Sequence, residues 1–123
     1  MKTNDKEIIY SIGIDVGSTT VKIIATDEKE NIIYEEYKRH FANVKETTLN
    51  MLKAIYAQYG NRNYTVSVTG SGGLNLAKKM QIKFVQEVVA VTFAVKKVAP
   101  HADVVIELGG EDAKIIYLKK CEK

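Results

Sequence analysis

Apolar and polar residues alternate along the start of the chain with a period of two, which is typical of a strand with one buried face. Between Ile8 and Asp15, one face carries Ile8, Tyr10, Ile12 and Ile14, while Ser11, Gly13 and Asp15 fall on the other. The pattern therefore predicts that Asp15 ends the strand on the face opposite the isoleucines.

Two further alternating stretches follow, at residues 21–26 and 32–38, and a polar turn at 27–31 separates them. Consecutive strands joined by short turns predict an antiparallel meander of three strands. The third stretch carries several charges, which are typical of an edge strand protected against pairing with another chain: Glu35, Glu36, Lys38 and Arg39.

After the meander, the apolar period changes to that of a helix. Asn43 and Glu46 have the spacing of a capping box, and Gly60 ends a series of residues at helical spacing: Leu52, Ile55, Tyr56 and Tyr59. We interpret the two tyrosines as core residues. This helix is expected to cross over the sheet, so the next strand, at 64–69, should lie parallel to the first.

The second half of the chain alternates the two patterns again. A short helix at 74–80, a short strand at 82–85 and a strongly apolar helix at 87–98 are predicted, and Pro100 stops the last of them. A helix with so many apolar residues is expected to be buried or to meet a partner.

A strand, glycine turn and strand unit completes the pattern. Residues 103–108 are almost continuously apolar, Gly109 and Gly110 form the turn, and 113–118 is the return strand. The unit repeats the form of the opening stretch, with acids around each turn. We interpret the pair as the two glycine hairpins of a nucleotide clamp built from two related domains.

Composition limits the classes of partner. The 123 residues, 46% of them hydrophobic, are enough for one core, and mixed charges give a formal net charge of +3. No basic stripe with interleaved aromatic residues is present, so nucleic acid is not an expected partner.

The apolar run at the N-terminus is too short for a signal sequence or a membrane span, so we expect a cytoplasmic protein with no membrane partner. A single cysteine, Cys121, excludes an internal disulfide.

The candidate chemistry begins where the first strand ends. Gly17 permits a tight reversal, after which the backbone N–H groups and hydroxyls of Ser18, Thr19 and Thr20 can surround phosphate oxygens. A carboxylate beside such a cradle suits Mg²⁺, so Asp15 is the candidate metal residue. An ordinary hairpin with a glycine turn is the alternative.

A second glycine-rich turn lies between the strand at 64–69 and the short helix after it, where glycines allow a ligand to approach the backbone. It consists of Thr69, Gly70, Ser71, Gly72 and Gly73. A flexible turn is the alternative. His40 has no second histidine or cysteine at ligand spacing, so we interpret it as a surface or hinge residue outside the site.

Four motifs in this order resemble a known group of ATPases. GIDVGSTTVK, VTGSGG, QEVVA and VIELGGEDAK are similar to the activators of 2-hydroxyacyl-CoA dehydratases and the ATPase subunits of benzoyl-CoA reductases. These belong to the superfamily of acetate kinase, sugar kinases, heat-shock chaperones and actin. The resemblance covers residues 8–117 and is strongest to the N-terminal ATPase module of the long CoA-substrate-specific enzyme activases.

The resemblance implies an α/β fold: a ribonuclease-H-like (actin-like ATPase) domain plus the first hairpin of a second such domain. Its mixed five-stranded sheet has three antiparallel strands followed by parallel ones, with helices on its faces. The expected boundaries are 1–100 for subdomain I and 101–123 for the opening hairpin of a truncated subdomain II.

The resemblance also implies a function. In these activators two ATPase subunits share an iron–sulfur cluster, and ATP hydrolysis drives one electron onto a dehydratase or reductase. ATP or ADP and Mg²⁺ are the implied cofactors of this chain. No cysteine stands in a Cys-Ala-Gly-Gly setting after the second glycine hairpin, so the cluster is expected only in the full-length protein.

By position, the resemblance gives each motif residue a role. Asp15 is expected to hold Mg²⁺ through water, with Glu107 as a second metal-side carboxylate. The residues expected to bind or line the phosphate cleft are Gly17, Ser18, Thr19, Thr20, Thr69, Gly70, Ser71, Gly72 and Gly73. Gly109 and Gly110 are expected to donate N–H groups to the phosphates, and Glu111 to orient the attacking water as the catalytic residue.

Two other functions stay open: a fragment of a small-molecule kinase of the same superfamily, and a non-catalytic interaction module. A two-metal nuclease is disfavoured, because the strand at 64–69 carries no carboxylate. The expected partners are nucleotide, the rest of the chain in the full-length protein, and its CoA-dehydratase. The apolar hairpin at 103–118 is also expected to form a homodimer, because unpaired edge strands recruit other chains.

Overall fold

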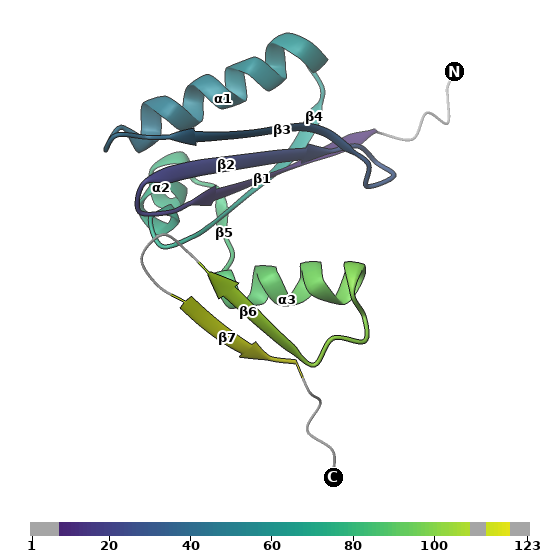
Figure 1. The fold of residues 1–123 in the computed structure, drawn as a ribbon. Helices are drawn as coiled ribbons and strands as arrows, with labels where there is room; N and C mark the ends of the chain where they lie inside the picture. The colour runs from purple at the N-terminus through teal and green to yellow at the C-terminus, as the bar shows by residue number, and fades with distance from the viewer. Residues whose placement is uncertain (1–7, 109–112, 119–123) are drawn as a thin grey trace. The chain divides into compact units, whose positions relative to one another are not determined.

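A computed structural model describes residues 8–108 and 113–118 of the protein. The chain forms two compact units, residues 1–84 and 85–123 (Figure 1). The expected domain boundary after residue 100 stays a prediction. In the part of the chain that the structure describes, no helix has both the length and the apolar composition needed to cross a bilayer.

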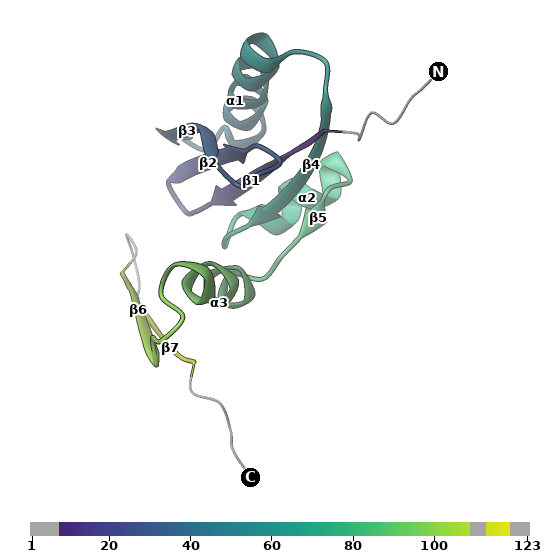
Figure 2. The same cartoon turned by 90° about the vertical axis from the view of Figure 1, so that its right-hand side faces the viewer.

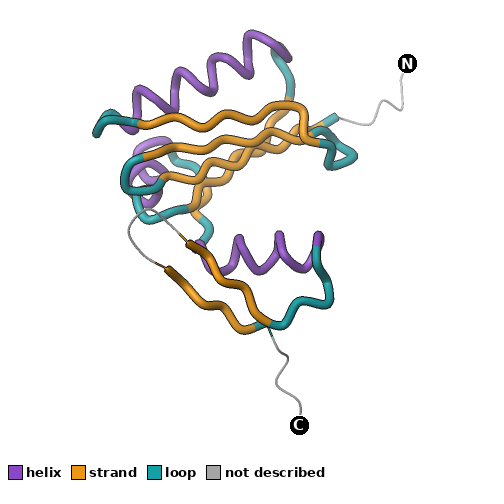
Figure 3. The backbone as a smooth tube through the Cα atoms, viewed as in Figure 1, coloured by secondary structure: helices purple, strands orange, loops and turns teal. Residues whose placement is uncertain are grey.

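The first unit contains one mixed sheet of five strands in the order β3-β2-β1-β4-β5 (Figures 1 and 3). The β1–β2 and β2–β3 pairs are antiparallel, whereas β4 lies parallel to β1 and β5 parallel to β4. This confirms the predicted fold class, with the charged third strand at one edge. The elements are β1 (Ile9–Val16), β2 (Thr20–Thr26), β3 (Ile32–Arg39), α1 (Val44–Tyr59), β4 (Asn63–Thr69), α2 (Gly73–Met80) and β5 (Lys83–Phe84).

The core lies on one face of this sheet. Alternating residues of β1 are buried, and their partners in register on β2 and β4 are buried beside them: Ile12, Ile14, Val16, Val21, Ile23, Ala25 and Val68. Met51 and Ile55 of α1 and Leu76 and Ala77 of α2 complete the same cluster. The opposite face of β1 carries Ser11, Gly13 and Asp15, as the period of two predicted.

The buried stripe of α1 matches the predicted one in part, since Ile55 is buried and Leu52 and Tyr59 pack against the core. Thr48, Met51 and Ile55 face the sheet, whereas Tyr56 is 59% exposed, so its interpretation as a core residue was wrong. Tyr59 is partly buried, packs against the core and donates its hydroxyl to the Ile33 carbonyl oxygen at 2.5 Å. The Asn43 side chain makes no capping hydrogen bond, because Asn43 adopts neither helical nor extended backbone angles.

The second unit contains α3 (Glu87–Val98) and an antiparallel hairpin of β6 (Val104–Leu108) and β7 (Ala113–Tyr117). The helix and the hairpin lie side by side in two views (Figures 1 and 2), and Lys114 Nζ on β7 contacts Glu87 Oε1 on α3 at 2.5 Å. Because Lys114 faces α3, the opposite face of the hairpin points away from the helix. That face is exposed and apolar: Val104, Ile106, Leu108, Ile115 and Tyr117.

Candidate functional site

The two glycine turns of the first unit lie at the same edge of the sheet. β1 and β4 are parallel, with Asp15 opposite Thr69 in the register, so the turns that follow the two strands leave the sheet next to each other. The Gly72 N–H joins them by donating to the Val16 carbonyl oxygen at 2.9 Å. The structure therefore brings together the candidate residues 15–20 and 69–73.

The second turn approaches the end of β1 as closely as a glycine allows. Gly70 has φ +101°, and a Cβ atom on it would lie 2.3 Å from the Val16 carbonyl oxygen and 2.5 Å from Asp15 Oδ1. A Cβ on Gly72 would lie 2.9 Å from Val16 Cγ1. Any side chain at Gly70 would thus collide with the candidate metal carboxylate, so glycine is required there by both backbone angle and space.

Polar groups collect around Asp15. The Lys22 Nζ lies 3.9 Å from Asp15 Oδ2 and 5.6 Å from the Tyr37 ring centroid. Thr69 Oγ1, at the neighbouring strand end, is buried and has no hydrogen-bond partner within the described part of the chain. A buried hydroxyl without a partner is costly, and a polar ligand beside Asp15 would remove that cost.

The residues present fit a Mg²⁺ ion that is held jointly by the protein and by the phosphate oxygens of a nucleotide. No cluster of three acidic, histidine or cysteine side chains suited to a metal occurs among the residues described. Mg²⁺ needs none, because it is usually held by one or two carboxylates together with waters and phosphate oxygens. Asp15 supplies one such carboxylate, next to a turn with exposed hydroxyls at Ser18 and Thr19.

The first turn is closed by backbone contacts. The Gly17 N–H donates to the Thr20 carbonyl oxygen at 2.8 Å. A Cβ on Gly17 would meet only Thr20 atoms, at ordinary contact distances of 3.6 Å and more. Unlike Gly70, Gly17 is therefore not required by the shape of the turn; its hydrogen in place of a side chain leaves the approach to the backbone open.

His40 is the residue at this site that sequence reasoning missed. It is only 7% exposed, so the surface alternative in its interpretation as a surface or hinge residue was wrong. Its Nε2 lies 3.1 Å from the Gly17 carbonyl oxygen, and its backbone N–H donates to the Thr19 carbonyl oxygen at 3.0 Å. A single histidine carries no spacing signal, and only the pairing of β3 with β2 brings it to the turn.

The remaining candidates belong to the second unit. Gly109, Gly110 and Glu111 lie outside the described residues. Glu107, on β6, is opposite Lys114 in the register, and its Oε1 is buried without a hydrogen-bond partner in the described ranges. Glu107 Oε1 and Thr69 Oγ1 are thus both buried polar atoms that have no hydrogen-bond partner among the described residues.

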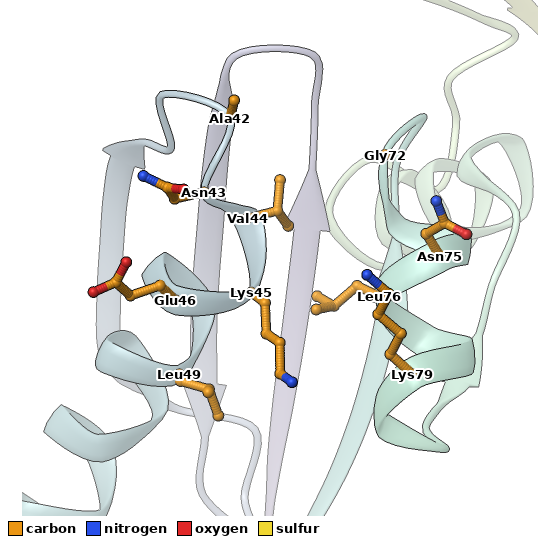
Figure 4. Close-up of a pocket in the computed structure, with 10 residues that line it drawn as sticks. All are labelled: Ala42, Asn43, Val44, Lys45, Glu46, Leu49, Gly72, Asn75, Leu76 and Lys79. Carbon is orange, nitrogen blue, oxygen red and sulfur yellow. The ribbon is translucent and has the colours of Figure 1, made fainter.

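A cavity of about 500 Å³ lies between α1 and α2 (Figure 4). Lys45 of α1 and Lys79 of α2 extend from the two helices at its sides, and Gly72 lines its upper end in the figure. Asp15 and Thr69 are not among its lining residues, since the cavity lies on the helix-covered side of the sheet and Asp15 on the other. No pattern in the sequence indicated this cavity.

The sheet order and the two helices on it define an α/β fold of the actin-like, ribonuclease-H-like class. No protein-family model matches the chain. An uncharacterized protein of Methanocaldococcus jannaschii is 29% identical over 109 residues, which are 89% of this chain and 43% of that protein. The chain therefore spans less than half the length of this relative.

Solved structures share the fold. Component A of the (R)-2-hydroxyglutaryl-CoA dehydratase of Acidaminococcus fermentans matches with a TM-score of 0.76 and 23% identity, over 90% of this chain and 43% of that one. The activator of the 2-hydroxyisocaproyl-CoA dehydratase of Clostridium difficile, solved with bound ADPNP, matches with a TM-score of 0.67 and 24% identity, over 89% and 41%. An Aquifex aeolicus member of the Ppx/GppA family matches with a TM-score of 0.57 and 13% identity, over 90% and 51%.

Proposed function

We propose that this chain is the nucleotide-binding part of an ATP-dependent activator that drives single-electron transfer to a 2-hydroxyacyl-CoA dehydratase or a related reductase. The main support for nucleotide binding is the place where the two glycine turns meet. There Gly70 lies directly against Asp15, next to the buried Thr69 hydroxyl, which has no hydrogen-bond partner among the described residues. The fold shared with two dehydratase activators supports the finer role.

In this proposal the first unit binds the phosphates of ATP or ADP. Backbone N–H groups and hydroxyls of Ser18, Thr19 and Thr20 surround the outer phosphates, and the turn at 69–73 lines the same site. Asp15 holds Mg²⁺ through water, and the metal neutralises phosphate charge when it is bound. The Thr69 hydroxyl gains a partner in the bound state.

The roles of the second glycine hairpin stay predictions. They are Glu107 as a metal-side carboxylate, Gly109 and Gly110 as N–H donors to phosphate, and Glu111 as the residue that orients water. An iron–sulfur cluster stays a prediction as well.

Calorimetric titration tests the proposal. The chain should bind Mg·ADP with a Kd on the order of 0.1 to 1 mM, because one set of phosphate contacts must offset the cost of association. Asp15→Asn should weaken binding about tenfold and abolish its dependence on Mg²⁺. Asp27→Asn is the matched control: it removes the same charge from the β2–β3 turn, where Asp27 accepts hydrogen bonds from Lys29 and Asn31, and should leave binding unchanged. Absence of binding at 10 mM nucleotide would contradict the assignment.

The exposed face of the hairpin supports a second part of the proposal, self-association. Ile106 is 64% exposed, Leu108 78% and Tyr117 74%, and all lie on the face turned away from α3. A two-stranded sheet with one uncovered apolar face favours contact with another apolar surface. Two copies pairing through 103–118 would bury this face symmetrically.

A further inference from the structure

His40 lies between the first glycine turn and the start of α1 and contacts both. Its ring Nε2 is 3.1 Å from the Gly17 carbonyl oxygen, and the Ala42 N–H donates to its Nδ1 at 3.1 Å. Its backbone also takes part, because its N–H donates to the Thr19 carbonyl oxygen and its carbonyl accepts from the Asn43 N–H. One buried residue therefore makes four hydrogen bonds, two of them to the turn.

The contact with Ala42 determines the form of the imidazole. Since Nδ1 accepts a backbone N–H, it carries no proton, so the neutral ring carries its proton on Nε2. Nε2–H then donates to the Gly17 carbonyl oxygen. The hydrogen bond from Ala42 thus fixes the orientation of the ring, and the hydrogen bond to Gly17 holds the carbonyl group of the turn.

The loop that carries His40 is held in a costly conformation. Phe41 and Ala42 both have left-handed backbone angles, with φ of +47° and +67°, which non-glycine residues rarely adopt. Such angles persist where surrounding contacts hold them, and they concentrate at functional sites. Here the Ala42 N–H and the Asn43 N–H both donate hydrogen bonds to His40, so these bonds stabilise the strained loop and also fix the position of the histidine.

We propose that His40 is a positioning residue for phosphate binding, which rests on the proposed function of the turn. The carbonyl of Gly17 and the N–H of Ser18 belong to one planar trans peptide, so they point in opposite directions. The carbonyl of Thr19 and the N–H of Thr20 form a second such unit. By holding both carbonyl oxygens, His40 directs the N–H groups of Ser18 and Thr20 away from itself and fixes the orientation in which they meet an anion.

Two near-isosteric substitutions separate the ring contacts. In His40→Gln the terminal amide N–H can replace Nε2–H at the Gly17 carbonyl, whereas in His40→Asn the shorter side chain can replace only Nδ1 as the acceptor for Ala42. Both are expected to fold, since each keeps one ring contact and both backbone bonds. Mg·ADP affinity should stay within about threefold of wild type in His40→Gln and fall about tenfold in His40→Asn.

Amide hydrogen exchange of the nucleotide-free protein provides a readout that does not depend on nucleotide binding. The Gly17 N–H, bonded to the Thr20 carbonyl oxygen, should exchange roughly three- to tenfold faster in His40→Asn, the range expected for loss of one hydrogen bond, and at the wild-type rate in His40→Gln. Amides of β4 should be unchanged in both variants. Those values would show that the histidine ring orders the turn.

The two measurements distinguish failure of this inference from failure of the proposed function. If wild type shows no affinity for Mg·ADP but the exchange rates differ as expected, the nucleotide assignment is wrong and His40 still orders the turn. If His40→Asn binds Mg·ADP as tightly as wild type, or if its Gly17 exchange is unchanged, the positioning role is overturned. Equal losses in His40→Asn and His40→Gln overturn it as well, because they indicate general destabilisation.

Discussion

Gly70 combines two separate requirements for glycine. Its φ of +101° is unfavourable for a residue with a side chain, and a Cβ would lie within 2.5 Å of the Val16 carbonyl oxygen and Asp15 Oδ1. Gly70→Ala should therefore reduce the free energy of unfolding by roughly 2 to 4 kcal/mol, the sum expected for backbone strain and overpacking. Urea denaturation measures this. Gly13→Ala, where a Cβ would meet nothing within 4 Å, is the control and should change stability by under about 1 kcal/mol.

Tyr34 and Glu36 form a pH-sensitive pair on β3. The Tyr34 hydroxyl donates to Glu36 Oε1 at 2.6 Å, which lowers the pKa of the Glu36 carboxyl, helped by Lys38 at 3.2 Å, and raises the pKa of Tyr34 to about 12. A carboxyl whose pKa is lower in the folded state stabilises the fold above its ordinary pKa of 4.5, and this contribution is lost as the pH falls through the folded value. The raised pKa of Tyr34 has the opposite sign, so its contribution is complete below pH 10 and lost as the pH rises through about 12.

Tyr34→Phe should consequently destabilise the protein by about 1 kcal/mol at pH 7, the usual value of one hydrogen bond, and by less at pH 3. Denaturation curves at both pH values check the expectation. Tyr37→Phe, a 64% exposed tyrosine on the same strand, should show no such pH-dependent difference. A deficit of the same size for Tyr34→Phe at both pH values would contradict the assignment.

The helix α1 is held to the sheet by a narrow stripe of side chains. Met51 is fully buried and Ile55 is 1% exposed, whereas Tyr56 beside it is 59% exposed. Met51→Ala should cost roughly 2 to 5 kcal/mol, because the cavity is surrounded by packed atoms that relax only in part. Tyr56→Ala should stay within about 0.5 kcal/mol of wild type by thermal or chemical denaturation. A larger loss at Tyr56 would show that the helix packs through a different face.

The assembly of the chain depends on the apolar face of the β6–β7 hairpin. If two copies pair through that face, Ile106→Lys should shift the protein from dimer to monomer in sedimentation at about 100 μM, because a lysine at the centre of the interface would have to lose its hydration. The folded monomer should keep its stability, as Ile106 is 64% exposed within one copy. Tyr56→Lys, the same kind of change in the first unit, should leave the dimer intact. If the wild-type protein is a monomer under these conditions, the proposed dimer is wrong.

Local sequence patterns were enough to predict the first strand, its buried face, two glycine turns and the bounds of α3. The alternation from Ile9 to Val16 determined the strand, its buried face and the opposite position of Asp15, because side chains on a strand alternate whatever the strand packs against. The glycine turns after β1 and β4 and the bounds of α3 at 87–98 were also correctly predicted, since turns and helix ends depend on neighbours a few residues away. The motifs pointed to the fold that the sheet order then confirmed.

Contacts between distant segments decided the rest. His40 is separated from Gly17 by 23 positions, and only the β2–β3 pairing brings its ring to that carbonyl oxygen. Likewise, the parallel pairing of β1 with β4 brings Gly70 against Asp15, and the face of α1 that packs on the sheet contains Met51 and leaves Tyr56 exposed. Helical spacing alone leaves several neighbouring stripes equally apolar. The sequence by itself therefore determined the elements and the residue types of the site, and the tertiary structure decided which of those residues touch, because contact depends on the packing of elements that are remote along the chain.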